Sequence, residues 1–318
     1  MELPSYENLP IAPHLPPRSA WGVWGEDDQL GTINLLTDER AARAAALVKR
    51  GRTFPLNWAM EQPSPAFYGR EELKHRIYTM LPGIFDDAVD NLFTQSSSQW
   101  DALCHIGHPE YGFWNGAKAE DFTGKPGTRN GVEQYARKGI VGRGVLLDIA
   151  RHWEETGRAI DGGTTVEFTP ADLEEVREAQ GIEFEQGDIL LLRTGWMHWY
   201  EQSSDDIKEG LAADSLARLQ TPGLIGGEAM AEWLWNNHFA AVAADNPALE
   251  AWPHRIEVDQ YIHFRLIPLL GMAMGEMWYL EDLAADCAED KSYEFMLTSA
   301  PLNLLGGVGS PPNAMAIK

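Results

Sequence analysis

The feature that most constrains the fold is a series of short apolar runs that alternate with helix signals. Each run has the length and composition of a buried strand. Thr169 followed by Pro170 predicts the start of a helix that continues to about Gly181, and residues 228–237 predict another helix with one apolar face. Strands interleaved with helices indicate a mixed α/β fold rather than an all-helical or repeat protein. The predicted buried strands lie within residues 143–150, 187–196, 239–244 and 271–280.

The chain of 318 residues is long enough to bury a large core. No segment has the composition of a linker between independently folded domains, so we expect a single domain over residues 1–318. Residues 1–20 are rich in proline and predict an irregular arm on the surface. Residues 73–81 predict a further strand, and the acidic run from Asp86 to Asp90 predicts a solvated turn.

The charge and the cysteine content exclude several classes of partner. The net charge is −23, from 48 acidic and 25 basic residues, which argues against a nucleic acid or an anionic membrane as partner. No apolar run reaches the length of a transmembrane helix. Two cysteines, Cys104 and Cys287, cannot form a disulfide framework, and the first residues do not resemble a signal peptide. We therefore expect a cytoplasmic protein that acts on a small molecule.

One stretch, residues 95–105, carries most of the chemical side chains. Gln95, Gln99, Asp101 and His105 are separated by even numbers of residues, so an extended strand would place all four on one face. Such a polar face is costly to bury unless it binds a metal ion or a substrate. Trp100 lies within this stretch, and we include it among the predicted substrate-binding residues.

The spacing in this stretch resembles the motif H-x-G-T-H-x-D-x-P-x-H of the cyclase family of metal-dependent hydrolases, which includes bacterial kynurenine formamidases and isatin hydrolases. The aspartate and the last histidine of the motif fall on Asp101 and His105, but the two leading histidines fall on Gln95 and Gln99. The resemblance extends in order over most of the chain. It includes residues 21–36, 143–148, 187–196, 245–246 and 306–311.

The resemblance implies a compact α/β fold of layered mixed sheets with flanking helices, described for the family as a swivelling β/β/α domain. It also implies a metal site completed by His263 and Glu276, late in the chain. By the same resemblance, Asp101 is the central ligand and His105 is the catalytic base that moves protons. Family members form homodimers or homotetramers, so we expect a homo-oligomer.

The two glutamines change the expected metal content. Amide oxygens are weak and neutral ligands, poorly suited to Zn²⁺. We therefore expect one divalent ion, Mn²⁺ or Zn²⁺, held by Asp101, His263 and Glu276, with Gln99 as a further oxygen ligand. The alternative is that Gln95 and Gln99 hydrogen-bond a substrate or the neighbouring backbone. Gln95 is accordingly predicted as a substrate-binding residue.

Aromatic residues in two loops complete the predicted substrate pocket. Phe67 and Tyr68 lie in a loop that supplies an aromatic side chain in shorter family members. Tyr111 and Trp114 lie in a Gly-rich and aromatic loop that follows the 95–105 stretch.

The resemblance implies hydrolysis of an amide, a cyclic amide, a lactone or an ester by metal-activated water. Two alternatives remain open. The chain could be a metal-free relative that binds a small molecule without turnover, or a lyase or cyclase on the same scaffold.

Overall fold

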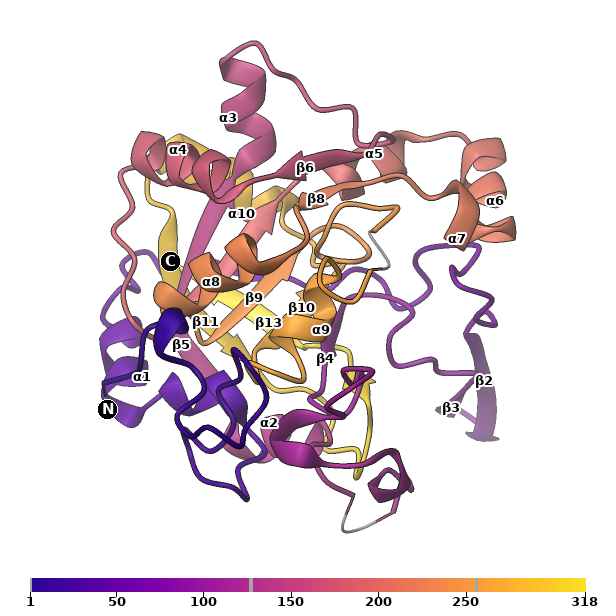
Figure 1. Ribbon diagram of the computed structural model, residues 1–318. Helices are drawn as coiled ribbons and strands as arrows, with labels where there is room; N and C mark the ends of the chain where they lie inside the picture. The colour runs from indigo at the N-terminus through magenta and orange to yellow at the C-terminus, as the bar shows by residue number, and fades with distance from the viewer. Residues whose placement is uncertain (1, 126–127, 255–256) are drawn as a thin grey trace.

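The computed structural model describes residues 2–125, 128–254 and 257–318. Its centre is a nine-stranded mixed sheet in the order β1-β13-β11-β5-β7-β9-β10-β4-β12 (Figure 1). β5, β7, β9 and β10 run parallel, and antiparallel strands flank them on both sides. The strands of this sheet are β1 Thr53–Pro55, β4 Gln99–Asp101, β5 Ile140–Asp148, β7 Ile189–Arg193, β9 Ala241–Ala244, β10 Ala273–Glu276, β11 Glu294–Ser299, β12 Gly309–Ser310 and β13 Ala314–Ile317.

Helices and short 3-10 turns surround this sheet. The α-helices are α1 Asp38–Ala45, α2 Glu133–Lys138, α3 Ile149–Glu155, α4 Pro170–Gln180, α5 Trp196–Gln202, α6 Asp205–Ala213, α7 Ser215–Arg218, α8 Glu228–Asn236, α9 Ile262–Leu266 and α10 Glu281–Asp290. The 3-10 helices are η1 Tyr6–Asn8, η2 Gly31–Leu35, η3 Trp114–Gly116 and η4 Ala119–Asp121. The predicted mixed α/β fold is confirmed. Among the described residues, no helix is both long enough and apolar enough to cross a membrane.

The central parallel strands form because their side chains are apolar on both faces. β7 and β9 are fully buried apart from Arg193 at the end of β7. The small side chains of β9 allow close packing: a side chain on Gly275 of β10 would meet the Cβ of Ala243 at 2.7 Å. Parallel sheets of this kind need cover on both faces, which the surrounding helices and loops provide.

The predicted start of α4 is confirmed in detail. The Thr169 side chain accepts a hydrogen bond from the Asp172 backbone N–H, the Asp172 carboxylate accepts from the Thr169 N–H, and Pro170 takes the first helical position. Gly181 ends the helix in the left-handed conformation, at φ 68°. The local sequence therefore specifies both ends of this helix.

Residues 2–20 contain one short 3-10 turn and otherwise irregular backbone. This segment packs on the core, because the side chains of Leu3, Tyr6 and Leu9 are buried. Asn236 at the end of α8 accepts a hydrogen bond from the Tyr6 backbone N–H.

Two smaller sheets lie outside the central one. β6 Val166–Phe168 pairs in parallel with β8 Pro222–Leu224. β2 Lys74–Leu81 and β3 Ile84–Asp90 form an antiparallel hairpin that stands apart from the central sheet at the side of the molecule (Figure 1). The prediction of a solvated turn at Asp86–Asp90 is wrong, because these residues lie in the exposed strand β3.

Candidate metal centre

The pairing of β4 with β10 brings two carboxylates to one point. Gln99 on β4 lies opposite Glu276 on β10, and Asp101 lies two residues further along the same face of β4. His263 reaches the same point from α9. The ligand atoms of Asp101, His263 and Glu276 all lie within 4.8 Å of one another, and all three residues are buried. The structure therefore brings together the three residues that the sequence predicts as metal ligands.

The side chains of Gln95 and His105 also lie at this point, but turns rather than an extended strand place them there. Only Gln99–Asp101 form a strand, and turns precede and follow it, so the prediction of one continuous strand through residues 95–105 is wrong. The Gln95 amide donates to Asp101 Oδ1 at 2.7 Å and lies 3.1 Å from His105 Nδ1. His105 Nε2 is 3.8 Å from Asp101 Oδ1. The two turns thus fold the Gln95 and His105 side chains onto the Asp101 carboxylate.

Glu250, which the sequence reasoning did not single out, orients His263. His263 Nδ1 donates to Glu250 Oε1 at 2.6 Å, and Nε2 lies 3.2 Å from Glu276 Oε1. Both Glu250 and His263 are almost completely buried. The available signal was an isolated carboxylate in the otherwise apolar run Leu249–Trp252. A carboxylate that fixes the outer nitrogen of a metal-ligating histidine is a common supporting contact in metal sites.

The burial of these groups shifts their pKa values. Burial lowers the pKa of His263, but the hydrogen bonds to Glu250 and Glu276 outweigh it and raise the pKa to about 10. Burial and the nearby charge of Asp101 raise the pKa of Glu276 to about 7. Burial also lowers the pKa of His105, against the opposing effect of Asp101. This lowering of the pKa favours the neutral form of the His105 imidazole.

The residues of this cluster fit a divalent cation. Asp101 Oδ2 and Gln99 Oε1 are buried, and within the described part of the chain neither has a hydrogen-bond partner. The Gln99 amide donates instead to Glu276 Oε2 at 2.6 Å. A buried carboxylate oxygen without a partner is costly, and a cation at this point would offset the cost. Two carboxylates and an imidazole are ligands suited to Mn²⁺ or Zn²⁺.

Tyr68 is the predicted pocket residue that lies near the cluster. Its hydroxyl is buried and has no hydrogen-bond partner among the described residues. Its backbone adopts φ 61°, a conformation that bulky residues rarely take. Burial and then the charge of Glu276 raise its pKa. Arg70 stacks over the Tyr68 ring at 5.1 Å and donates to the Gln95 carbonyl oxygen.

Tyr261 is a second aromatic neighbour of the cluster, and the sequence reasoning missed it. Its ring stacks on His263 with the centroids 4.7 Å apart. Tyr261 lies directly before α9, which carries His263, so the start of this helix places both side chains next to each other.

The structure does not place the other predicted aromatic residues at the cluster. Trp100 points to the opposite face of β4, where it is fully buried and donates to Ser299 Oγ, because neighbouring residues on a strand alternate in direction. Trp114 is also fully buried and donates to the Asp28 backbone carbonyl. Both indoles are core residues.

Phe67 and Tyr111 contact other aromatic side chains or a histidine ring. Phe67 is buried in a separate aromatic cluster, edge-on to Trp196 and Tyr200. Tyr111 stacks on the His108 imidazole at 4.6 Å.

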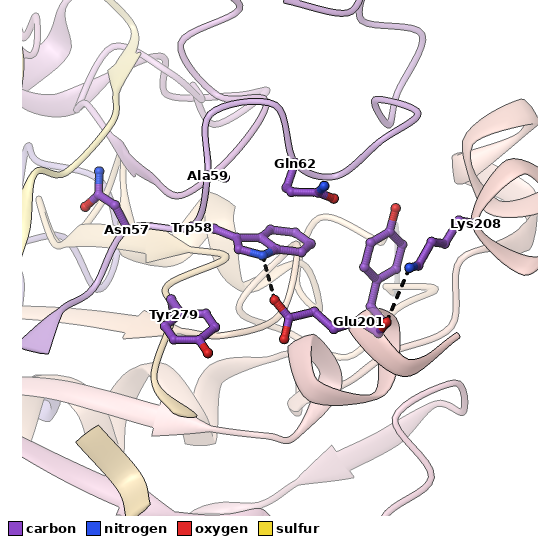
Figure 2. Close-up of a pocket in the computed structure, with 8 residues that line it drawn as sticks. Asn57, Trp58, Ala59, Gln62, Glu201, Lys208 and Tyr279 are labelled. Atoms are coloured by element: carbon purple, nitrogen blue, oxygen red, sulfur yellow. Dashed lines mark hydrogen bonds between the residues drawn. The ribbon is translucent and has the colours of Figure 1, made fainter. Parts of the chain in front are cut away.

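A separate hollow of about 590 Å³ lies next to this aromatic cluster (Figure 2). Trp58 forms one wall and donates through its indole nitrogen to Glu201 at 2.9 Å. The Trp58 backbone N–H donates to Ser98 Oγ, so this wall is fixed to the residue that precedes Gln99. None of the three predicted metal ligands is among the residues that line it.

Comparison with known proteins decides the family. Residues 52–251 match the model of the Cyclase family, described as "Putative cyclase". The chain belongs to the cyclase family. A crystal structure described as a novel cyclase is 34% identical and superposes with a TM-score of 0.82 over 94% of this chain and 99% of its own. A comparison with curated proteins gave no match.

More distant cyclase-fold structures include isatin hydrolases. Isatin hydrolase A from Labrenzia aggregata, bound to benzyl benzoate, is 17% identical, with a TM-score of 0.56 over 90% of this chain and 98% of its own. Isatin hydrolase A from Ralstonia solanacearum is 17% identical, with a TM-score of 0.53 over 89% of this chain and 98% of its own. At this identity the similarity shows a shared fold.

Proposed function

We propose that this cyclase-family protein is a metal-dependent hydrolase that cleaves an amide, a cyclic amide, or a lactone or ester bond in a small molecule. The observation that carries the proposal is the buried convergence of Asp101, His263 and Glu276 within 4.8 Å, beside a neutral His105. The isatin hydrolases that share the fold support a hydrolytic reaction on a small ring.

Asp101, His263 and Glu276 would hold the ion, and Glu250 would keep the His263 ring in position through Nδ1. When bound, a divalent ion supplies Lewis-acid chemistry, polarising a carbonyl group and lowering the pKa of water. Tyr68 offers a buried hydroxyl that can donate to a substrate oxygen.

His105 moves the proton in this proposal. Its lowered pKa keeps the imidazole neutral, so it can accept a proton from water and return it to the leaving group. The acceptor is Nε2, the nitrogen nearer to Asp101. Nε2 can accept this proton in the tautomer that carries hydrogen on Nδ1.

The first test is the metal content of the purified protein. We expect about one equivalent of Mn²⁺ or Zn²⁺ per chain by elemental mass spectrometry, and a loss of most of it in Asp101→Asn, because a buried charged ligand is removed. Asp27→Asn, an exposed residue, is the matched control and should keep the metal. Equal metal in Asp101→Asn and the wild-type protein would reject the site.

The second test is turnover on a panel of formamide, cyclic imide and lactone substrates, after removal and readdition of Mn²⁺ or Zn²⁺. We expect hydrolysis of at least one class that depends on added metal. Bound metal with no hydrolysis of any class would reject the proposed reaction.

One observation favours a second candidate, a metal-free binding protein. The Gln95 amide donates to Asp101 and the Gln99 amide donates to Glu276, so two neutral groups partly satisfy the carboxylates without an ion. No bound metal and no turnover, together with saturable binding of a panel member by calorimetry, would favour this candidate.

A further inference from the structure

The chain bends directly after β10, at the residue that follows the predicted ligand Glu276. This residue, Met277, adopts φ 52°, in the left-handed region that residues with a long side chain rarely take. Its side chain is buried in the aromatic cluster that contains Trp58 and Phe67. A residue stays in such a conformation only where its surroundings hold it there. The contacts of Met277 therefore also fix the end of β10, where Glu276 lies.

Three hydrogen bonds hold this bend. The Met277 N–H donates to the Asn246 carbonyl at 2.9 Å, and the Trp278 N–H donates to the Ala244 carbonyl at 3.0 Å. The Met277 carbonyl accepts a hydrogen bond from the Ser98 hydroxyl. The first two bonds join backbone to backbone, so of these three only the bond from Ser98 depends on the identity of a side chain.

The Ser98 hydroxyl has a second partner, which fixes the direction of both bonds. Ser98 Oγ accepts from the Trp58 backbone N–H at 2.7 Å. A carbonyl can only accept, so the single hydrogen of the hydroxyl is used on Met277. Ser98 is 2% exposed, so water does not compete for either bond. Alanine at this position can make neither bond, whereas threonine keeps the hydroxyl that makes both.

The register between β4 and β10 places Ser98 at the bend. Glu276 pairs with Gln99, so the residue before Gln99 faces the residue after Glu276. The Gln99 amide donates to Glu276 Oε2 at 2.6 Å, and the Gln99 carbonyl accepts from the Trp278 indole at 3.0 Å. Ser98 thus holds the sequence neighbour of a predicted ligand and is not itself one of the three ligands.

We propose that Ser98 is a positioning residue of the metal centre. Its hydroxyl holds Met277 in the left-handed conformation and thereby directs the Glu276 carboxylate into the metal cluster. Ser98 does not contact the ion in this proposal, so its effect reaches the metal through Glu276. The inference rests on the proposed function, because it assigns a role at the same metal site.

Metal affinity tests the proposal. Ser98→Ala should raise the metal dissociation constant by about 10- to 100-fold, the range for the loss of a contact that orients a ligand, measured by chelator competition on the metal-free protein. Ser98→Thr keeps the hydroxyl and should restore most of the affinity. Ser97→Ala is the matched control and should bind metal as the wild-type protein does. The Ser97 side chain is also buried, but its hydroxyl donates to the Ala59 carbonyl, at 2.9 Å.

A double mutant separates positioning from a general loss of stability. Because Ser98 acts through Glu276, adding Ser98→Ala to Glu276→Gln should change the metal dissociation constant by no more than about twofold. The melting temperatures of the metal-free proteins verify that the variants fold.

Three results would each overturn the proposal. They are additive losses in the double mutant, a Ser98→Ala variant that binds metal as tightly as wild type, and a Ser98→Thr variant that binds metal no better than Ser98→Ala. A wild-type protein that binds no metal would instead reject the proposed function, and this inference with it.

Discussion

Glu250 determines which nitrogen of His263 faces the metal cluster. Its carboxylate accepts the Nδ1 hydrogen at 2.6 Å, and this leaves Nε2 directed towards Glu276. Glu250→Gln keeps the size of the side chain but removes the charge that fixes the ring. We expect metal affinity to fall about 10- to 100-fold, measured by chelator competition on the metal-free protein.

Glu232→Gln, an exposed substitution on α8, is the control for this experiment and should bind metal as the wild-type protein does. A merely structural role for Glu250 would lower the melting temperature of the metal-free protein without changing the metal dissociation constant. That outcome would contradict the assignment.

His105→Asn tests the proton transfer. The variant should retain its metal, because His105 is not one of the three ligands, but kcat should fall by about 10²- to 10⁴-fold. The exposed His14→Asn serves as the control. Full activity in His105→Asn would assign the proton transfer to another group.

At the scale of single residues, the three predicted ligands converge, whereas Trp100 and Trp114 of the predicted pocket are core residues. Asp101, His263 and Glu276 were placed by their resemblance to a family motif, and the structure brings them together. Glu250 and Tyr261 were missed because each meets His263 only through the fold between β9 and α9. The contact of Glu250 with His263 spans 13 positions of the chain, and no spacing rule expresses it.

The sequence predicts the limits of an element best where capping residues mark them, as at the two ends of α4. Thr169→Ala should lower the free energy of unfolding by about 1 kcal/mol, because it removes the side-chain acceptor at the start of α4. Urea denaturation measures this change. Ser204→Ala is the matched control: Ser204 precedes α6 but makes no side-chain capping bond, so little change is expected. Equal losses in both variants would contradict the capping account.

Polar strands were the elements that the sequence predicted poorly. The carboxylates of β3 suggested a solvated turn, because a hairpin exposed on both faces lacks the apolar periodicity of a half-buried strand. The strand at Gln99–Asp101 is shorter than the even spacing of residues 95–105 suggested, because turns rather than extended backbone bring the flanking side chains inward.

At the scale of the whole molecule, a cluster of salt bridges connects α10 to the chain segments beside β1 and β13. The buried carboxylate of Asp286 on α10 pairs with Arg50 and Arg52 before β1, and with Lys318 after β13 at 3.1 Å. Burial raises the pKa of Asp286, but the hydrogen bonds from Arg50 and Lys318 outweigh it, so the pKa lies below its usual range.

A carboxyl with a lowered folded pKa stabilises the protein above its unfolded pKa of about 3.9, and this contribution is lost as the pH falls through the folded value. Asp286→Asn should therefore lower the free energy of unfolding at pH 7 by about 1–3 kcal/mol, with both arginines half-exposed and screened. The difference from wild type should shrink below pH 4. Urea denaturation at several pH values, with Asp27→Asn as control, measures this difference in the free energy of unfolding. A difference that does not depend on pH would contradict the account.

The order of the nine strands could not be derived from local sequence. β13 at the end of the chain lies between β1 and β11, and β12 lies at the opposite edge beside β4. Such pairings join residues that are hundreds of positions apart, so only the family resemblance could predict them. The sequence alone predicted the fold class and the buried strands, but not that these strands run parallel.

The β2–β3 hairpin projects from the molecule between Arg70 and Gln95, which are hydrogen-bonded to each other beside the metal cluster. Arg70, just before it, donates to the carbonyl of Gln95, just after it, and Gln95 holds Asp101 and His105. A displacement of the hairpin therefore changes the contacts of Gln95 with Asp101 and His105.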